Sequence, residues 1–214
     1  MSQHTWGIGV IACSQAMLLL TALFAQGQTN ESSYENVPQR LDINIQRGEM
    51  MGRDQVVRYF INSGTNQFLF VLPPNTRSEG QNPETLVLAG TDGPYFLSFR
   101  ILGFGPADAD PDKASARKEA VLDRYAGARN IEDFVMNVAG REAQGIQLRQ
   151  ELPAVGQRLV RVLLVPCRAG LLEFTINTDS RKAALANLAL SNLLGTFQSN
   201  ENGKIRIVPR SNQT

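Results

Sequence analysis

The stretch from Arg158 to Phe197 constrains the fold of this chain more than any other part of the sequence. It opens with the β-branched and leucine-rich run Arg158–Cys167, which is typical of a strand buried on both faces. Arg168–Gly170 predicts a turn, because glycine adopts positive φ without a steric penalty. In the next run, Leu172, Phe174 and Ile176 alternate with Glu173 and Thr175. The two runs therefore predict a β-hairpin.

A helix is predicted after this hairpin. Asp179 or Ser180 can cap its start, because a side-chain oxygen at that position accepts from the first-turn amides. One apolar stripe then recurs at steps of three or four residues, formed by Ala186, Leu190, Leu193 and Phe197. A hairpin and one amphipathic helix cannot bury their apolar surface alone, so further strands must form a sheet beneath the helix.

The rest of the chain supplies those strands. Alternating or β-branched runs predict strands at 41–45, 56–61, 68–72, 85–89, 95–102 and 145–152, with a short edge strand at 205–208. Loops are predicted at 46–54 and 75–83. Helices are predicted at 111–125, capped by Asp110, and at 131–139, capped by Asn130 with Glu132 and Asp133 near its positive end. This order predicts an α+β fold with a mostly antiparallel sheet.

The amino-terminal segment has the pattern of a secretory leader. The apolar core 17–24 is followed by Ala25-Gln26-Gly27, small residues of the kind that signal peptidase accepts. We expect cleavage after Gly27, with Ala25 as the second choice, and hence secretion or a periplasmic location. An uncleaved amino-terminal membrane anchor is the alternative, and 10–13 also has the form of a bacterial lipobox.

These patterns divide the chain into four parts. Residues 1–27 form the expected signal peptide, 28–38 a polar flexible linker, 39–198 a single α/β domain, and 199–214 a tail carrying the short edge strand. Within the linker, Asn30-Glu31-Ser32 is formally a glycosylation sequon. The domain is long enough to bury a sizeable core.

Parts of the sequence also resemble the PsbP-like group, the photosystem II extrinsic subunit and its bacterial secreted relatives. The matching features are 68–73, the hairpin 86–102, the helical middle and 161–197, in which Leu171–Ile176 and Leu193–Phe197 look like the family's closing unit. The resemblance implies an α/β/α sandwich around an antiparallel sheet, and an accessory or binding protein rather than an enzyme. Photosynthetic members bind manganese or calcium partly through histidine. That role does not carry over, because the one histidine here, His4, leaves with the leader.

The loss of His4 also removes the common imidazole-based chemistries. Ser-His-Asp and Cys-His nucleophile activation and imidazole metal sites are closed to the mature chain. Carboxylate acid–base chemistry, Ser-Lys pairs and cation binding by oxygen remain. We predict no catalytic residue and no organic cofactor, and the net charge of +1, from mixed acids and bases, argues against nucleic acid as a partner.

One acidic cluster has the spacing of a calcium loop. Counted from Asp108, acids fall at positions 1, 3, 5 and 12, as Asp108, Asp110, Asp112 and Glu119. Lys113 stands where such a loop needs glycine, and no helix precedes the run. The competing interpretation is an acidic helix start, favoured by the helix dipole.

Other candidate groups have equally plain structural explanations. Cys167, the one cysteine left after leader removal, is either a small apolar filler or a reactive thiol. Arg141 and Arg168 lie at predicted turns, either solvated or facing an anionic partner. The aromatic residues on strands form either the core or a ligand platform: Tyr59, Phe68, Phe70, Tyr95, Phe96 and Phe99.

Three functional hypotheses follow. The first is a secreted or periplasmic accessory or binding protein with a protein or envelope partner and no membrane contact after leader cleavage. The second is a carrier of a small apolar ligand, which requires an enclosed apolar cavity. The third is a histidine-independent hydrolase, which requires carboxylates converging in a cleft.

Overall fold

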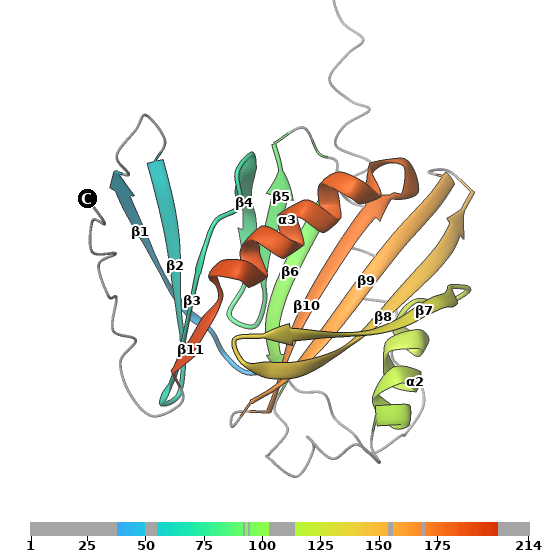
Figure 1. Cartoon of the computed structure of the whole chain (residues 1–214), viewed down its shortest axis with the longest axis horizontal. Helices are drawn as coiled ribbons and strands as arrows, with labels where there is room; N and C mark the ends of the chain where they lie inside the picture. Colours follow the sequence, from blue (N-terminus) through green and yellow to red (C-terminus); the bar gives the residue numbers. More distant parts are fainter. Residues whose placement is uncertain are drawn as a thin grey trace, which may run out of the picture. The chain divides into compact units, whose positions relative to one another are not determined.

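The computed structural model describes residues 38–49, 55–91, 93, 95–102, 114–153, 156–167 and 170–200 (Figure 1). Within these ranges the strands form two antiparallel sheets. The α+β class predicted from the sequence is therefore confirmed. The expected leader 1–27 and the predicted edge strand 205–208 lie outside the described residues, and no described helix has both the length and the apolarity needed to span a membrane.

The smaller sheet joins strands from the two ends of the described chain. Its order is β1-β2-β3-β11. The strands are β1 (Asp42–Glu49), β2 (Gln55–Ser63), β3 (Asn66–Val71) and β11 (Gln198–Asn200). Because β11 pairs with β3, the last described residues complete a sheet that the first ones begin.

The larger sheet contains the hairpin that the sequence predicts within Arg158–Phe197. Its order is β4-β5-β6-β10-β9-β8-β7, so the hairpin β9–β10 lies near its middle. The strands are β4 (Thr76–Gln81), β5 (Leu86–Gly90), β6 (Tyr95–Leu102), β7 (Arg129–Val138), β8 (Arg141–Leu152), β9 (Gly156–Cys167) and β10 (Gly170–Asp179). Both faces of β10 are buried along Gly170–Thr178.

Two helices cover opposite faces of the larger sheet. α3 (Ala183–Thr196) follows a short 3-10 turn, η3 (Ser180–Lys182), and its apolar stripe packs with Phe174 and Ile176. The other face of the sheet meets α2 (Ala114–Arg124), whose Val121 packs with Val160 and Val162. The structure therefore has the predicted layers of helix, sheet and helix, with the smaller sheet packed beside α3.

The main core is an aromatic cluster between the two sheets and α3. The ring of Phe99 lies 5.1 Å from Phe174 and 6.1 Å from Phe68, centroid to centroid, and Phe197 closes the group from the end of α3. Among the six strand aromatics predicted as core or platform, only Phe96 is half-buried, and the others are buried. They form the core.

The predicted helix 131–139 is wrong, because this segment is strand β7. Phe134, Met136 and Val138 point to the core at every second position, the period of a strand. The presumed helix cap has another role. The Asn130 side chain accepts from the Glu132 amide at 3.3 Å, where the pairing of β7 with β8 shifts register at a β-bulge.

Two predicted loops are also partly wrong. The loop 75–83 contains strand β4, whose polar composition suits the outer strand of a sheet. The loop 46–54 begins only after β1, which continues to Glu49, and 50–54 lie outside the described residues. The other strands predicted within the described residues are confirmed. α2, described from Ala114 to Arg124, lies inside the predicted helix 111–125, and the predicted cap Asp110 lies outside the described residues.

Candidate functional site

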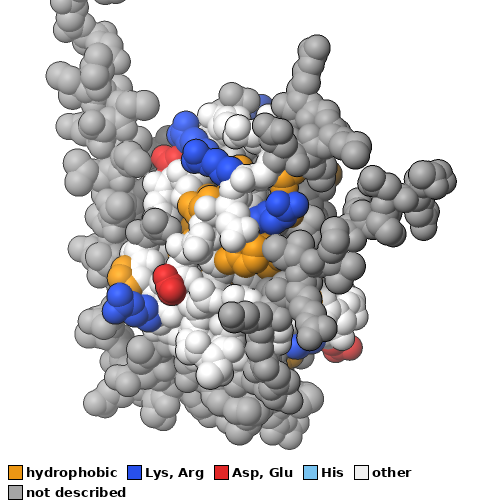
Figure 2. Space-filling model, turned by 90° about the vertical axis from the view of Figure 1, so that its left-hand side faces the viewer, with side chains coloured by type: hydrophobic (Ala, Val, Ile, Leu, Met, Phe, Trp, Pro, Cys, Tyr) orange, Lys and Arg blue, Asp and Glu red, His pale blue; other side chains and the backbone are white. Residues whose placement is uncertain are grey.

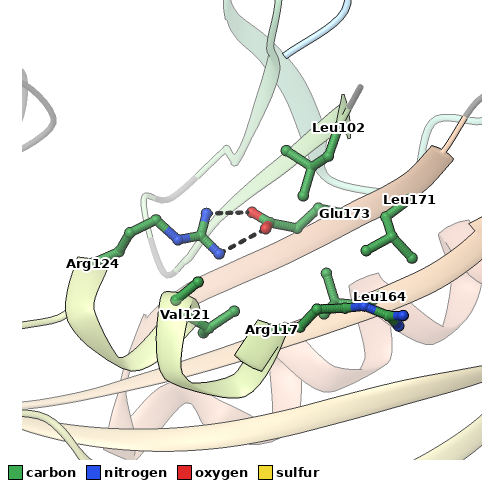
Figure 3. Close-up of a pocket in the computed structure, with 8 residues that line it drawn as sticks. Leu102, Arg117, Val121, Arg124, Leu164, Leu171 and Glu173 are labelled. Atoms are coloured by element: carbon green, nitrogen blue, oxygen red, sulfur yellow. Dashed lines mark hydrogen bonds and ion pairs between the residues drawn. The ribbon is translucent and has the colours of Figure 1, made fainter. Parts of the chain in front are cut away.

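The described charged groups with the most extensive contacts lie between α2 and the larger sheet. β10 places Glu173 on the α2 face, and Arg100 of β6 lies directly opposite it in the strand pairing. Arg124, in the last turn of α2, reaches the same carboxylate from above the sheet (Figure 3). We call Arg100, Arg124, Glu173 and Thr175 the Glu173 cluster.

Each guanidinium in the Glu173 cluster donates two hydrogen bonds to the carboxylate. Arg100 donates from Nε at 2.9 Å and from Nη2 at 3.1 Å, and Arg124 from Nη1 at 3.0 Å and Nη2 at 2.7 Å. The Thr175 hydroxyl adds a fifth contact at 3.1 Å. Bidentate pairing of this kind is the strongest hydrogen-bonding geometry available to an arginine and a carboxylate.

Burial determines what this cluster can do. The Glu173 side chain is 3% exposed, whereas those of Arg100 and Arg124 are 21% and 32% exposed. A carboxylate with so little exposure is stable in its charged form only when paired and hydrogen-bonded, and here both oxygens are occupied. Glu173 is therefore suited to anchoring α2 on the sheet, and poorly suited to removing a proton from a substrate.

A small hollow adjoins the cluster. Arg117 and Arg124, two turns apart on α2, line it together with Glu173 and apolar residues of β6, β9 and β10 (Figure 3). Its volume is about 20 Å³, which is room for about one water molecule. An apolar ligand does not fit in a space of this size.

Glu173 and Thr175 belong to a row of polar side chains on β10, and this row continues to Asn177. Arg158 Nη2 donates to Asn177 Oδ1 at 2.7 Å, and burial lowers the pKa of Arg158. Burial likewise raises the pKa of the Tyr125 phenol, which follows α2 and lies against this row. Polar side chains thus occupy the α2 side of β10, next to the apolar cluster that Val160 and Val162 of β9 form with Val121.

Another partly buried arginine, Arg161, lies on the opposite face of the sheet. The Arg161 guanidinium lies 4.3 Å from the centroid of the Phe134 ring, and its Nη1 donates to Asn187 of α3 at 2.8 Å. Burial lowers its pKa. Gly145 lies beneath Phe134 so closely that a Cβ there would lie 2.2 Å from the ring. Arg161 therefore connects α3 to the β7–β8 hairpin.

The structure leaves the predicted calcium site untested. Asp108, Asp110 and Asp112 lie outside the described residues, and Glu119 is an exposed residue of α2. Among the residues that are described, no three carboxylate, thiol or imidazole groups are placed to hold a metal ion. The calcium loop stays a prediction.

Two of the three remaining candidates, Cys167 and Arg141, lie within the described residues. Cys167 is buried at 7% exposure, at the end of β9. Arg141 starts β8 rather than lying in a solvated turn, and its Nη1 donates to Ser199 of β11 at 2.6 Å. Arg168 lies outside the described residues. Sequence reasoning missed Arg100 and Arg124, although one signal was present: Glu173 is the only charged residue in the apolar run 171–177.

Fold and site together define an α+β protein with two antiparallel sheets and a buried ion-pair cluster under one helix. No protein-family model and no curated protein matches the sequence. Comparison with solved structures does find similar folds, at sequence identities of 13% or less for the three described next.

These structures include cyanobacterial PsbP from Synechocystis, with 13% identity and a TM-score of 0.43 over 82% of this chain and 99% of that one. LpqN of Mycobacterium tuberculosis, a protein involved in cell envelope biogenesis, gives 10% identity and a TM-score of 0.43 over 74% and 91%. A Bacteroides thetaiotaomicron protein gives 6% identity and a TM-score of 0.48 over 64% of this chain, which spans 46% of that protein's length. A PsbP structure is thus among the solved structures that the comparison finds, as the sequence resemblance leads one to expect.

Proposed function

We propose that this protein is a non-enzymatic accessory or binding protein of the cell envelope, and that it contacts a protein partner through the outer face of α3. The proposal rests on one observation, the absence of charge on an exposed helix. Between Ala183 and Thr196 the helix carries no acidic or basic side chain. Its exposed positions are Ala184, Leu185, Leu188, Ser191, Asn192 and Gly195, which we call the α3 outer face.

A helix covered only by water normally carries charged residues on its outer side. Here Leu185 is 51% exposed and Leu188 58% exposed, one turn apart on the same side. Depletion of charge around apolar anchors is the composition that distinguishes the centre of a protein interface. The outer side of α3 therefore has the chemistry of a contact surface for another protein.

The exposed apolar residue Ile45, on β1, has a different setting from Leu185 and Leu188. Seen from the side of β1 and β2, apolar groups alternate with groups of arginine and lysine (Figure 2). On β1, Ile45 is 39% exposed, and Arg47, two residues on, is also exposed. An isolated exposed apolar residue of this kind needs no partner.

The Glu173 cluster supports binding over catalysis, because its carboxylate is engaged on both oxygens. The carrier hypothesis gains nothing from the hollow beneath α2, which has room for about one water molecule. The envelope location rests on the leader pattern in 1–27.

Site-specific photo-crosslinking in intact cells tests the proposal. A photoreactive residue at Leu188 should capture one discrete protein, and the same residue at the exposed position Gln144 of β8 should not. The double variant Leu185→Ala and Leu188→Ala, tested with the crosslinker at Ser191, should lower the yield of this product about tenfold. The double variant Glu142→Ala and Gln144→Ala, at exposed positions of β8 and also with the crosslinker at Ser191, should leave it near the wild-type level. Equal yields in both double variants would remove the outer face of α3 as the binding surface.

A further inference from the structure

The larger sheet ends in an open edge at β7. β7 pairs with β8 on one side and is the last strand in the order of the described sheet. Every second residue of an outer strand directs its N–H and C=O away from the sheet, where they can pair with another strand. The exposed side chains along β7 agree with an uncovered edge.

Only the first half of this edge is protected. The bulge between Asn130 and Glu132 interrupts regular pairing, and Glu132 and Asp133 add two acidic groups, both common devices against strand addition. From Phe134 to Val138 the strand carries no charge. Val135, in that half, is 63% exposed, the highest value among the large apolar residues described as exposed.

We propose that this edge pairs with β7 of a second copy of the chain, antiparallel and centred on Val135. In a dimer whose two-fold axis is perpendicular to the sheet, two residues that lie opposite each other have their side chains on the same face. The axis must therefore pass through a residue position and not between two residues. Centring on Glu132 or Asp133 places like charges directly opposite each other, which is destabilising. Repulsion between like charges therefore disfavours registers centred on Glu132 or Asp133 and favours a dimer centred in the uncharged segment Phe134–Val138.

The register centred on Val135 is complementary at its three central kinds of pair. Val135 lies against Val135 of the copy, and Phe134 lies against Met136, a favourable aromatic–sulfur combination that continues the main core across the interface. Asp133 lies against Asn137, whose amide can donate to the carboxylate. Hydrogen bonds from Lys118 and Asn130 lower the pKa of Asp133, so this acceptor is charged near neutral pH.

The pairing is short, from Glu132 to Val138, and stable complexes usually bury about 1,200–2,000 Å². We therefore expect a dimer that dissociates on dilution rather than a permanent one. This association uses the β7 edge and not the outer face of α3, so it is independent of the proposed partner contact.

Sedimentation equilibrium of the protein as isolated, over a wide concentration range, tests the dimer. The average mass should rise from monomer toward dimer. Val135→Lys places two ammonium groups opposite each other and should raise the dissociation constant at least about tenfold. Gln144→Lys makes the same charge change directly across from Val135 on β8, away from the edge, and should leave the constant unchanged. A monomer at all concentrations, or a dimer insensitive to Val135→Lys, overturns the proposal.

A disulfide tests the register independently. Opposite residues of paired strands have Cα atoms about 4.5–5.5 Å apart, within disulfide range. Val135→Cys should give a covalent dimer on mild oxidation, well above the background that the unsubstituted protein gives. Gln144→Cys should stay at that background. Equal yields from the two variants contradict the register centred on Val135.

Discussion

Arg100 and Glu173 lie directly opposite each other in the β6–β10 pair, and two hydrogen bonds of 2.9 and 3.1 Å join their side chains. Arg124 approaches the same carboxylate from α2 with two more. The pairing within the sheet and the docking of the helix thus depend on one acid.

Removing the charge of Glu173 should therefore destabilise the fold. Glu173→Gln leaves two guanidinium groups facing each other without an anion, and breaking a buried pair costs about 3–5 kcal/mol. Because both arginines are partly exposed, we expect about 2–4 kcal/mol here. Urea unfolding followed by circular dichroism measures the loss. Glu142→Gln, at an exposed position of β8, should change the free energy of unfolding by less than about 0.5 kcal/mol. Equal midpoints for the two variants would contradict the anchoring role.

Gly145→Ala should destabilise the β7–β8 hairpin. The added Cβ would lie 2.2 Å from the Phe134 ring, so the ring must leave its place beneath Arg161. Overpacking of this kind costs about 1–3 kcal/mol. Thermal unfolding provides the measurement, with Gly80→Ala on β4 as control, because a Cβ there meets no atom within 4 Å. Equal melting temperatures for the two variants would show that Phe134 moves aside at no cost.

Phe99→Ala should be among the most damaging single changes in the core. The ring contacts Phe68, Phe70, Phe174 and Phe197, so its removal opens a cavity shared by both sheets and α3. Truncation of a buried phenylalanine costs about 3–5 kcal/mol. Phe96→Ala removes the same atoms from the opposite, half-buried face of β6 and should cost clearly less in chemical unfolding. The reverse order would contradict the placement of the core.

The carboxyl group of Asp179 should titrate at unusually low pH. Hydrogen bonds from the Arg181 side chain and backbone lower its pKa from 3.8 to about 2. A lowered pKa in the folded state contributes stability that is complete above the unfolded value and is lost as the pH falls from about 4 to about 2. NMR titration of the carboxyl carbon measures the midpoint. Arg181→Ala should raise it only part of the way, because the backbone donor remains. An unchanged midpoint in this variant would exclude the side-chain contact.

Local sequence patterns predicted most of the strands, because apolar and polar residues alternate along a strand of which only one face is buried. Leu172, Phe174 and Ile176 point to the main core as expected. The sequence could not show that the Glu173 face is also covered, since that depends on α2 arriving from a distant part of the chain. The partners Arg100 and Arg124 are 73 and 49 residues away from Glu173.

The error at β7 has a local cause. An asparagine followed by two acids is a common helix start, and the same residues also suit a bulged outer strand. The polar strand β4 was missed for a related reason, because outer strands do not need the apolar composition that identifies buried ones. In both segments, the position at the outer edge of a sheet determined the secondary structure.

The pairing of β11 with β3 has a consequence for the order in which the chain can fold. Residues 198–200 add the last strand to a sheet whose other members lie between 42 and 71. Phe68 and Phe70 gain their covering helix only after Thr196 has left the ribosome. A growing polypeptide therefore keeps these rings uncovered until the whole of α3, Ala183–Thr196, has been synthesised.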